Sequence, residues 1–319
     1  MNIFTAKKMK WCARHLLQQS NTDYRKTVLF HEAVLLGGLV LMQMLSWLLN
    51  SMAGDTGGLS GIGTRSLIGT VEAVCSLAVT VLMPFWSIGI FHTSIGVVRR
   101  QRVERPMLAE GFRRFGLVLR YYLMMIVVAI PVALGASMIA GTLAMLLPET
   151  KTVLYAMMFS MQDPAQTLEA LPMDAMLTMT VFTMAIYMII VCGVTLYINY
   201  RLFAASYLVM DEACPGAIAA MSASNRLTKG YKWKLAKLDL SFWWYYLLQF
   251  AAGLLVYGNV ILTALGIELP MDSAIADLLF YILYIGATLA IAWFAGAYIN
   301  TTHACAYQQI LDPSVLPEE

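Results

Sequence analysis

The sequence predicts an all-α membrane protein, a bundle of six transmembrane helices, and three observations carry that prediction. Hydrophobic residues make up 60% of the 319 residues and charged residues only 13%, whereas a soluble domain carries about a quarter charged residues. The mean hydropathy is +0.69. Apolar runs long enough to cross the hydrocarbon core recur along the chain, and the lysines and arginines gather between alternate runs.

The runs set the domain organisation. A basic, partly amphipathic arm covers residues 1–26, a membrane domain covers 27–311, and a short polar tail covers 312–319. The arm has neither the early apolar core nor the small-residue cleavage site of a signal peptide. The six predicted transmembrane helices span residues 28–52, 67–98, 115–147, 176–210, 240–265 and 274–311.

The positions of the basic residues predict the orientation of the chain. Of the 21 Lys and Arg residues, all but Arg65 and Lys151 lie in the arm, in the segment 99–120 or in the segment 201–237. Positively charged loops remain on the cytoplasmic side of a membrane. We therefore expect six crossings of the cytoplasmic membrane, with both termini in the cytoplasm.

The stretch between the fourth and fifth runs predicts an amphipathic segment on the membrane surface. Asp211 and Glu212 precede Pro215, an arrangement that favours a helix start, and Gly230 can end that helix. Lysines and aromatic residues then alternate, as they do at a membrane–water boundary. The expected docking residues of the cytoplasmic face are Arg99, Arg100, Arg113, Arg114, Lys229, Lys232, Trp233, Lys234 and Lys237. Because these residues adjoin apolar runs, anionic lipid or an acidic protein partner is a better counterpart than nucleic acid.

A weaker pattern indicates three helical hairpins. The first, third and fifth runs each follow a basic and aromatic segment, and the last two of these segments share the order Gly, aromatic, base and Tyr-Tyr. The alternative interpretation is that any re-entry into the membrane from a basic loop has this composition.

No motif predicts catalysis, a metal site or a cofactor. His31-Glu32 is not followed by a second histidine at metal-ligand spacing, and the five cysteines form no CxxC pair. The glycine-rich turn after the first run lacks the Gly-Lys-Ser/Thr ending of a phosphate loop. We expect reduced thiols and no enzymatic activity.

A few ionisable residues enter the apolar runs, and such residues are functional candidates in a membrane. They are Glu72, His92, Arg120, Arg201 and His303. His92 and Arg120 lie near cytoplasmic helix ends, where a side chain can reach water. The side chain of Glu72 is too short to reach water in this way, so both a structural role and a place in a transport pathway remain open for it.

Several segments together resemble a known family. They are Gly89 with Arg99, Glu110-Gly111-Phe112, Tyr207, Asp211, Ser222 or Ser224, Thr228-Lys229-Gly230, Leu240-Ser241-Phe242 and the closing AYINTTHACAYQQIL. This set resembles the bacterial membrane family named domain of unknown function 975, although Ala297 and Ala306 replace a usual proline and phenylalanine. The resemblance implies a six-helix prokaryotic membrane protein with no established activity. A looser likeness is to the membrane domain fused to some glycerophosphodiester phosphodiesterases, whose catalytic domain this sequence lacks.

Two functions follow as hypotheses. The first is a non-enzymatic scaffold or regulatory partner at the cytoplasmic membrane, with a basic face that docks lipid or protein. The alternative is a transporter for a small or lipid-like substrate, with Glu72 in the pathway. A polar cavity that reaches Glu72 favours transport, and exposed surface helices at the basic end favour docking.

Overall fold

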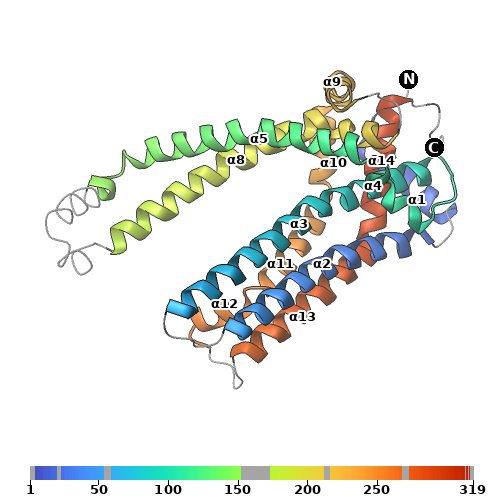
Figure 1. Ribbon diagram of the computed structural model, residues 1–319. Helices are drawn as coiled ribbons and strands as arrows, with labels where there is room; N and C mark the ends of the chain where they lie inside the picture. The colour runs from blue at the N-terminus through green and yellow to red at the C-terminus, as the bar shows by residue number, and fades with distance from the viewer. Residues whose placement is uncertain are drawn as a thin grey trace. The chain divides into compact units, whose positions relative to one another are not determined.

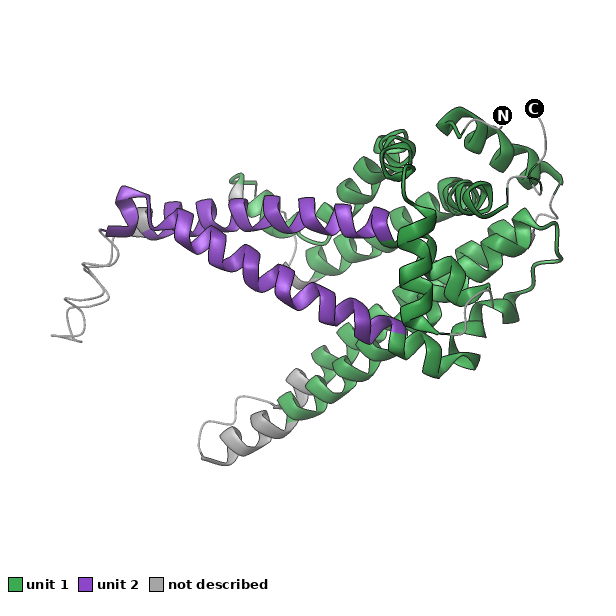
Figure 2. Ribbon diagram, turned by 90° about the horizontal axis from the view of Figure 1, so that it is seen from above, with its two compact units in different colours: residues 1–120, 202–319 green, residues 121–201 purple. Residues whose placement is uncertain are grey.

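The computed structural model describes residues 4–19, 23–53, 59–151, 173–211, 216–267, 273–312, 314 and 316. These residues form helices and no β-strand, which confirms the all-α prediction (Figure 1). The chain divides into two compact units. Unit 1 comprises residues 1–120 and 202–319, and unit 2 comprises residues 121–201 (Figure 2).

Long apolar helices build the body of unit 1. Helix α2 runs beside α3, and α13 lies along α2 and continues through the π-helical turn η3 into α14, which packs on α3. These elements are α2 (Asp23–Ala53), α3 (Leu59–Val98), α13 (Ser273–Ile291), η3 (Ala292–Gly296) and α14 (Ala297–Leu311). Pro84 lies inside α3. Membrane helices tolerate an internal proline because neighbouring groups satisfy the freed backbone carbonyl.

The fifth apolar run differs from its prediction. Instead of one helix over residues 240–265, it forms α11 (Trp243–Leu255) and α12 (Gly258–Ala264), and both pack on α13. Neither piece has the roughly 20 residues of a single crossing. In the described residues, five helices are long and apolar enough to span a membrane: Tyr24–Ser46, Ile68–Val98, Phe115–Ala144, Met176–Met210 and Ile275–Leu311.

Shorter helices cover one end of unit 1. Helix α1 lies against α14, α10 and α3, and the segment η1–α4 folds back along α3. Their bounds are α1 (Ala6–Gln19), η1 (Arg105–Ala109), α4 (Glu110–Arg113), α9 (Ala217–Leu227) and α10 (Lys232–Leu240). Helix α9 begins at Ala217, two residues after Pro215 as expected, and Gly230, with φ +86°, makes the turn between α9 and α10. The predicted surface segment is therefore two helices joined by a tight turn.

Unit 2 contains residues 121–144 of α5 (Phe115–Ala144) and residues 173–201 of α8 (Met173–Met210). Both helices expose large apolar side chains, among them Ile126, Leu134 and Ile189. Exposed apolar residues on helices of this length are typical of surfaces that contact lipid.

Candidate functional site

The C-terminal ends of three long helices, α3, α8 and α14, converge on Tyr207, which lies on the last turns of α8 inside unit 1. Its ring stacks on Tyr307 of α14 with the centroids 4.8 Å apart, and it meets the edge of Phe91 of α3 at 4.9 Å. The rings of Phe203 and His303 lie 6.0 Å apart beside them. Aromatic pairs at these separations contribute beyond their buried area. They fix the ends of α3, α8 and α14 to one another.

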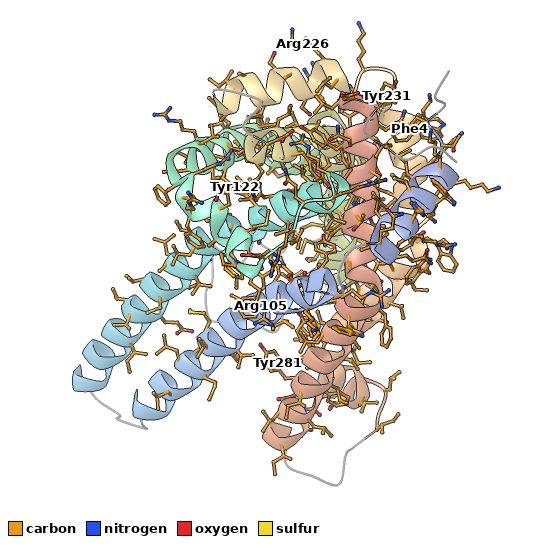
Figure 3. All side chains as sticks on the ribbon, turned by 90° about the vertical axis from the view of Figure 1, so that its right-hand side faces the viewer. Phe4, Arg105, Tyr122, Arg226, Tyr231 and Tyr281 are labelled. Carbon is orange, nitrogen blue, oxygen red and sulfur yellow. The ribbon has the colours of Figure 1, made fainter. Side chains whose placement is uncertain are left out.

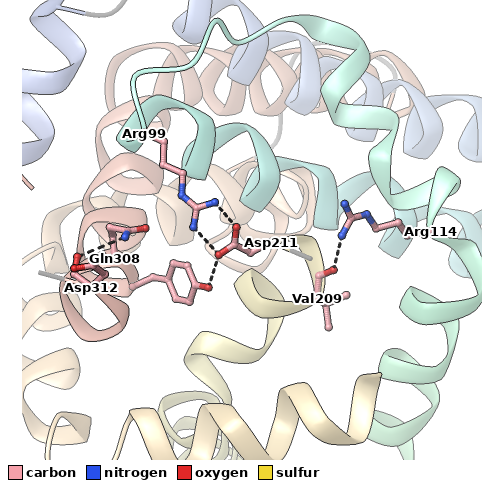
Figure 4. A network of polar contacts seen from close by, with 7 residues as sticks. Arg99, Arg114, Val209, Asp211, Gln308 and Asp312 are labelled. Atoms are coloured by element: carbon pink, nitrogen blue, oxygen red, sulfur yellow. Dashed lines mark hydrogen bonds and ion pairs between the residues drawn. The ribbon is translucent and has the colours of Figure 1, made fainter. Parts of the chain in front are cut away.

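A buried ion pair lies next to these rings (Figure 4). Both terminal nitrogens of Arg99 donate to the carboxylate of Asp211, the Nη2–Oδ2 distance being 2.6 Å, and the Tyr307 hydroxyl donates to Oδ2 at 2.9 Å. The Asp211 side chain is only 5% exposed. The hydrogen bonds that Arg99 donates to Asp211 raise the pKa of the guanidinium, which therefore remains charged.

The end of α3 has a geometry that presents Arg99 to its partner. The amide of Arg100 donates to the Val97 carbonyl and that of Gln101 to the Gly96 carbonyl, and Arg100 has φ 57°. This pattern is a Schellman cap, with an arginine where glycine is usual. The cap ends α3 at Val98, leaves Arg99 at the C-cap position and turns the chain back toward η1.

Two glycines hold the returning segment against α3. A β-carbon on Gly89 would lie 2.0 Å from the Leu108 carbonyl oxygen, and one on Gly111 would lie 2.0 Å from the Phe85 oxygen. Only glycine permits backbones to approach this closely. Arg114 then bonds Glu110 at 3.1 Å and donates to the Val209 carbonyl at 3.3 Å, which joins the segment to the end of α8.

Helix α1 is attached to the same end of the bundle. Lys10 Nζ donates to the Ser241 carbonyl at 2.9 Å and lies 4.3 Å from the centre of the Phe242 ring. Burial, together with the nearby charge of Arg14, lowers the pKa of Lys10. Phe4 meets the ring of Tyr231 at 5.5 Å (Figure 3). These contacts place the arm beside the turn that leads from α10 into α11.

Two further contacts connect α14 to these surface helices. The sulfur atoms of Cys12 and Cys305 are 3.2 Å apart in the core between α1 and α14. His303 Nε2 lies 2.7 Å from Asp239 Oδ1, at the end of α10.

The predicted docking residues fall into two groups. Arg99 and Arg114 are engaged in the ion pairs above, and Lys232 is half-buried. The others are exposed, and we call them the basic surface: Arg100, Arg113, Lys229, Trp233, Lys234 and Lys237. On α10 the ammonium of Lys237 lies 5.8 Å from the Trp233 ring, and that of Lys234 lies 5.1 Å from Tyr231.

The intramembrane candidates are placed separately. His303 joins the aromatic cluster, His92 is half-buried on α3, and Arg120 is exposed at the start of α5. Arg201 is exposed on the part of α8 that belongs to unit 2. Glu72 lies apart from the basic end and lines an open groove of about 610 Å³ between α2, α3 and α13.

The residues that suggested a family thus meet at one end of unit 1, and comparison with known sequences decides the membership. Residues 26–314 match the family described as protein of unknown function DUF975. The chain belongs to that family. No curated protein and no solved structure matches the chain.

In this DUF975 chain, the segments that carry the resemblance have structural roles. Gly89 and Gly111 permit the backbone approaches, Arg99, Asp211 and Tyr307 form the buried cluster, and Phe242 packs beneath Lys10. The sequence did not show that these residues meet, because they are far apart along the chain. The polar neighbours of Glu72 were also missed, although their helical spacing is visible in three of the apolar runs.

Proposed function

We propose that this DUF975 protein is a non-enzymatic multi-pass protein of the prokaryotic cytoplasmic membrane, acting as a scaffold or regulatory partner through its basic surface. The observation that carries the proposal is the attachment of the basic segments to one end of unit 1. Lys10 bonds the Ser241 carbonyl and Arg114 bonds the Val209 carbonyl. The exposed charges therefore stand on an ordered support instead of on free loops.

Six crossings, with both termini in the cytoplasm, are part of this proposal. Cys12 meets Cys305, so the arm and the end of α14 lie at the same end of unit 1. The fifth run begins beside Lys10, at Phe242, and Gly258 of α12 lies against the Phe280 ring near the start of α13. Both α11 and α12 pack along α13, which supports their crossing as a broken pair. The three-hairpin repeat is consistent with the convergence of α3, α8 and α14 and stays a proposal.

The chemistry of the basic surface fits an anionic lipid leaflet. Each Lys or Arg near such a leaflet contributes about 1 kcal/mol, and the attraction decays within a Debye length of about 8 Å at physiological salt. Trp233 is 72% exposed between Lys229 and Lys237, and indole rings favour headgroup depth. A positively charged loop alone orients a protein, but an exposed tryptophan on a helix adds a site of contact.

The experiment replaces Lys229, Lys232, Lys234 and Lys237 with Gln in the full-length protein. Phosphatidylglycerol that co-purifies in mild detergent is then quantified at low and high salt. We expect the Gln variant to retain several-fold less of this lipid at low salt, and the variant with Arg at all four positions to match the wild type. An acidic protein lost from the Gln variant, with lipid unchanged, would identify a protein partner instead. Equal lipid and protein in all samples would reduce the lysines to orientation signals.

The groove at Glu72 favours a second candidate, a permease for a small or lipid-like substrate. A polar groove that includes none of the basic-surface residues is not required for docking. The test is flux into proteoliposomes under an imposed cation or proton gradient. Transport predicts that Glu72→Gln abolishes the flux in a protein that remains folded.

A further inference from the structure

The groove at Glu72 is built from matching faces of three helices. Each of α2 and α3 contributes residues at positions i, i+3, i+4 and i+7, which form one helical face. The lining residues are Leu39, Met42, Gln43 and Ser46 of α2, Gly69, Glu72, Ala73 and Ser76 of α3, Tyr281 and Tyr284 of α13, and Val256 at the break between α11 and α12.

The polar side chains within each face share the groove. Gln43 and Ser46 come from α2, Glu72 and Ser76 come from α3, and the tyrosines come from α13. Helices packed on one another in a membrane use small residues and some Ser or Gln on such faces, whereas a carboxyl group is rare there and marks a partner or a cavity. Glu72 among polar groups on three converging faces therefore indicates a ligand site.

Glu72 gives the groove its charge. Among the lining residues it is the one acid, and none of them is Lys, Arg or His. A carboxylate at this depth in a membrane normally faces a partner or a water-filled cavity. A cationic ligand would supply a counter-charge that none of these lining residues provides.

The other lining groups suit an organic cation better than a metal ion. The rings of Tyr281 and Tyr284 lie 6.0 Å apart on α13, and Tyr281 is labelled in Figure 3. Aromatic faces attract ammonium groups, and the Gln43 amide oxygen can accept an ammonium hydrogen. One carboxylate with neutral oxygens is a poor set for Ca²⁺ or Mg²⁺, whose sites in proteins use more charged oxygens.

The shape of the groove leaves room for an apolar body. A β-carbon on Gly69 would meet nothing within 4 Å, and Ala73 is the other small residue on that face. Leu39, Met42 and Val256 supply apolar lining. The volume of about 610 Å³ lies within the range of small-molecule sites.

We propose that the groove binds an organic ammonium ion with an apolar body, its charged nitrogen beside Glu72 and the two tyrosines. The ligand is either a free amine or the ammonium headgroup of a lipid. This inference deepens the permease candidate by naming its substrate class, but it requires binding alone.

The experiment measures binding to the purified full-length protein in maltoside detergent by titration calorimetry. The probe is benzyltrimethylammonium, and its control is the uncharged carbon isostere neopentylbenzene. We expect saturable binding of the cation and at least tenfold weaker binding of the isostere. Glu72→Gln and the groove-filling Gly69→Leu should each weaken binding of the cation by at least tenfold. Glu104→Gln removes an exposed acid just before η1 that does not line the groove, and this variant should bind as the wild type does.

Absence of saturable binding to the wild type, or equal affinities for the wild type and a folded Glu72→Gln variant, would overturn the proposal. Gly69→Leu is a second, independent test of binding in the groove, because it fills open space without removing a charge. The source of the ligand is distinguished in nanodiscs. Competition by phosphatidylethanolamine in the disc identifies a headgroup, and competition by dissolved phenethylamine in phosphatidylglycerol discs identifies a free amine. If neither phosphatidylethanolamine nor phenethylamine competes with the probe, the proposal is also overturned. Binding without flux would leave the inference intact and remove the permease, and neither result bears on the lysines of the basic surface.

Discussion

The guanidinium of Arg99 and the carboxylate of Asp211 face each other in parallel, joining the end of α3 to the end of α8. The Asp211 side chain is 5% exposed and that of Arg99 is 32% exposed. Removing one partner leaves the other charge in a site with little water, a change that costs roughly 3–5 kcal/mol for a buried pair. Arg99→Ala and Asp211→Asn should therefore both lower the melting temperature strongly.

The measurement is thermal unfolding in detergent, with a double-mutant cycle on the pair. Tyr307→Phe removes one hydrogen bond to the same carboxylate and should cost about 1.5–3 kcal/mol. Arg113→Ala is the matched control, because its side chain is 79% exposed and its pair with Glu110 should contribute about 0–1 kcal/mol. Equal effects of Arg99→Ala and Arg113→Ala would contradict the structural role of the pair.

Gly111 should not tolerate a side chain. A β-carbon there would lie 2.0 Å from the Phe85 carbonyl oxygen, so Gly111→Ala must move η1 and α4 away from α3. Forcing extra atoms into a packed site costs typically about 1–3 kcal/mol. Gly116→Ala is the control. A β-carbon at Gly116 would meet nothing within 4 Å, and alanine in a helix is better than glycine by about 0.5–1 kcal/mol. Opposite shifts in melting temperature are expected, and a neutral Gly111→Ala would contradict the close approach.

Hydropathy and charge were sufficient to predict most of the fold. Runs of apolar residues locate α2, α3, α5, α8 and the α13–α14 pair because each must fill a membrane. The break at Val256 and Tyr257 was not visible, since both residues are as apolar as a continuous helix requires. A hydropathy pattern indicates which solvent surrounds a segment, but it does not indicate whether the segment forms one helix or two.

The site was less predictable, because its contacts join distant parts of the chain. Asp211 was interpreted as an acid before a helix start, but its partner is Arg99, 112 residues away. The local sequence favours a helix-capping role for Asp211, but tertiary packing places the Arg99 guanidinium beside it. Glu72 was recognised as unusual by its depth. Its surroundings emerge only when the faces of α2, α3 and α13 are brought together.

Cys12 and Cys305 offer a test of where α1 lies. Their sulfur atoms are 3.2 Å apart, and both residues are buried between α1 and α14. In a protein with Cys75, Cys192 and Cys214 replaced by Ser, a copper–phenanthroline oxidant should form an intramolecular disulfide. The product is detected by mass spectrometry after proteolysis. The same protein with Cys12→Ser should give no such link, and failure of the parent to cross-link would place α1 elsewhere.

The topology proposal makes the last prediction, which separates six crossings from five. Single cysteines are introduced into a variant lacking the native ones and labelled in intact cells with an impermeant maleimide. Gln101→Cys and Lys232→Cys, at the basic end, should react only after the membrane is permeabilised. Ser60→Cys and Gln166→Cys should react from outside. The deciding position is Ile267, which follows α12 and is 50% exposed. If α11 and α12 cross the membrane as a broken pair, Ile267→Cys reacts from outside. If they do not cross, Ile267→Cys is protected like Lys232→Cys, and α13 with α14 becomes the fifth crossing, so that α14 ends outside. Protection at Ile267 would therefore overturn the six-crossing topology and would put the end of α14, which meets Cys12 of the arm, on the outer side.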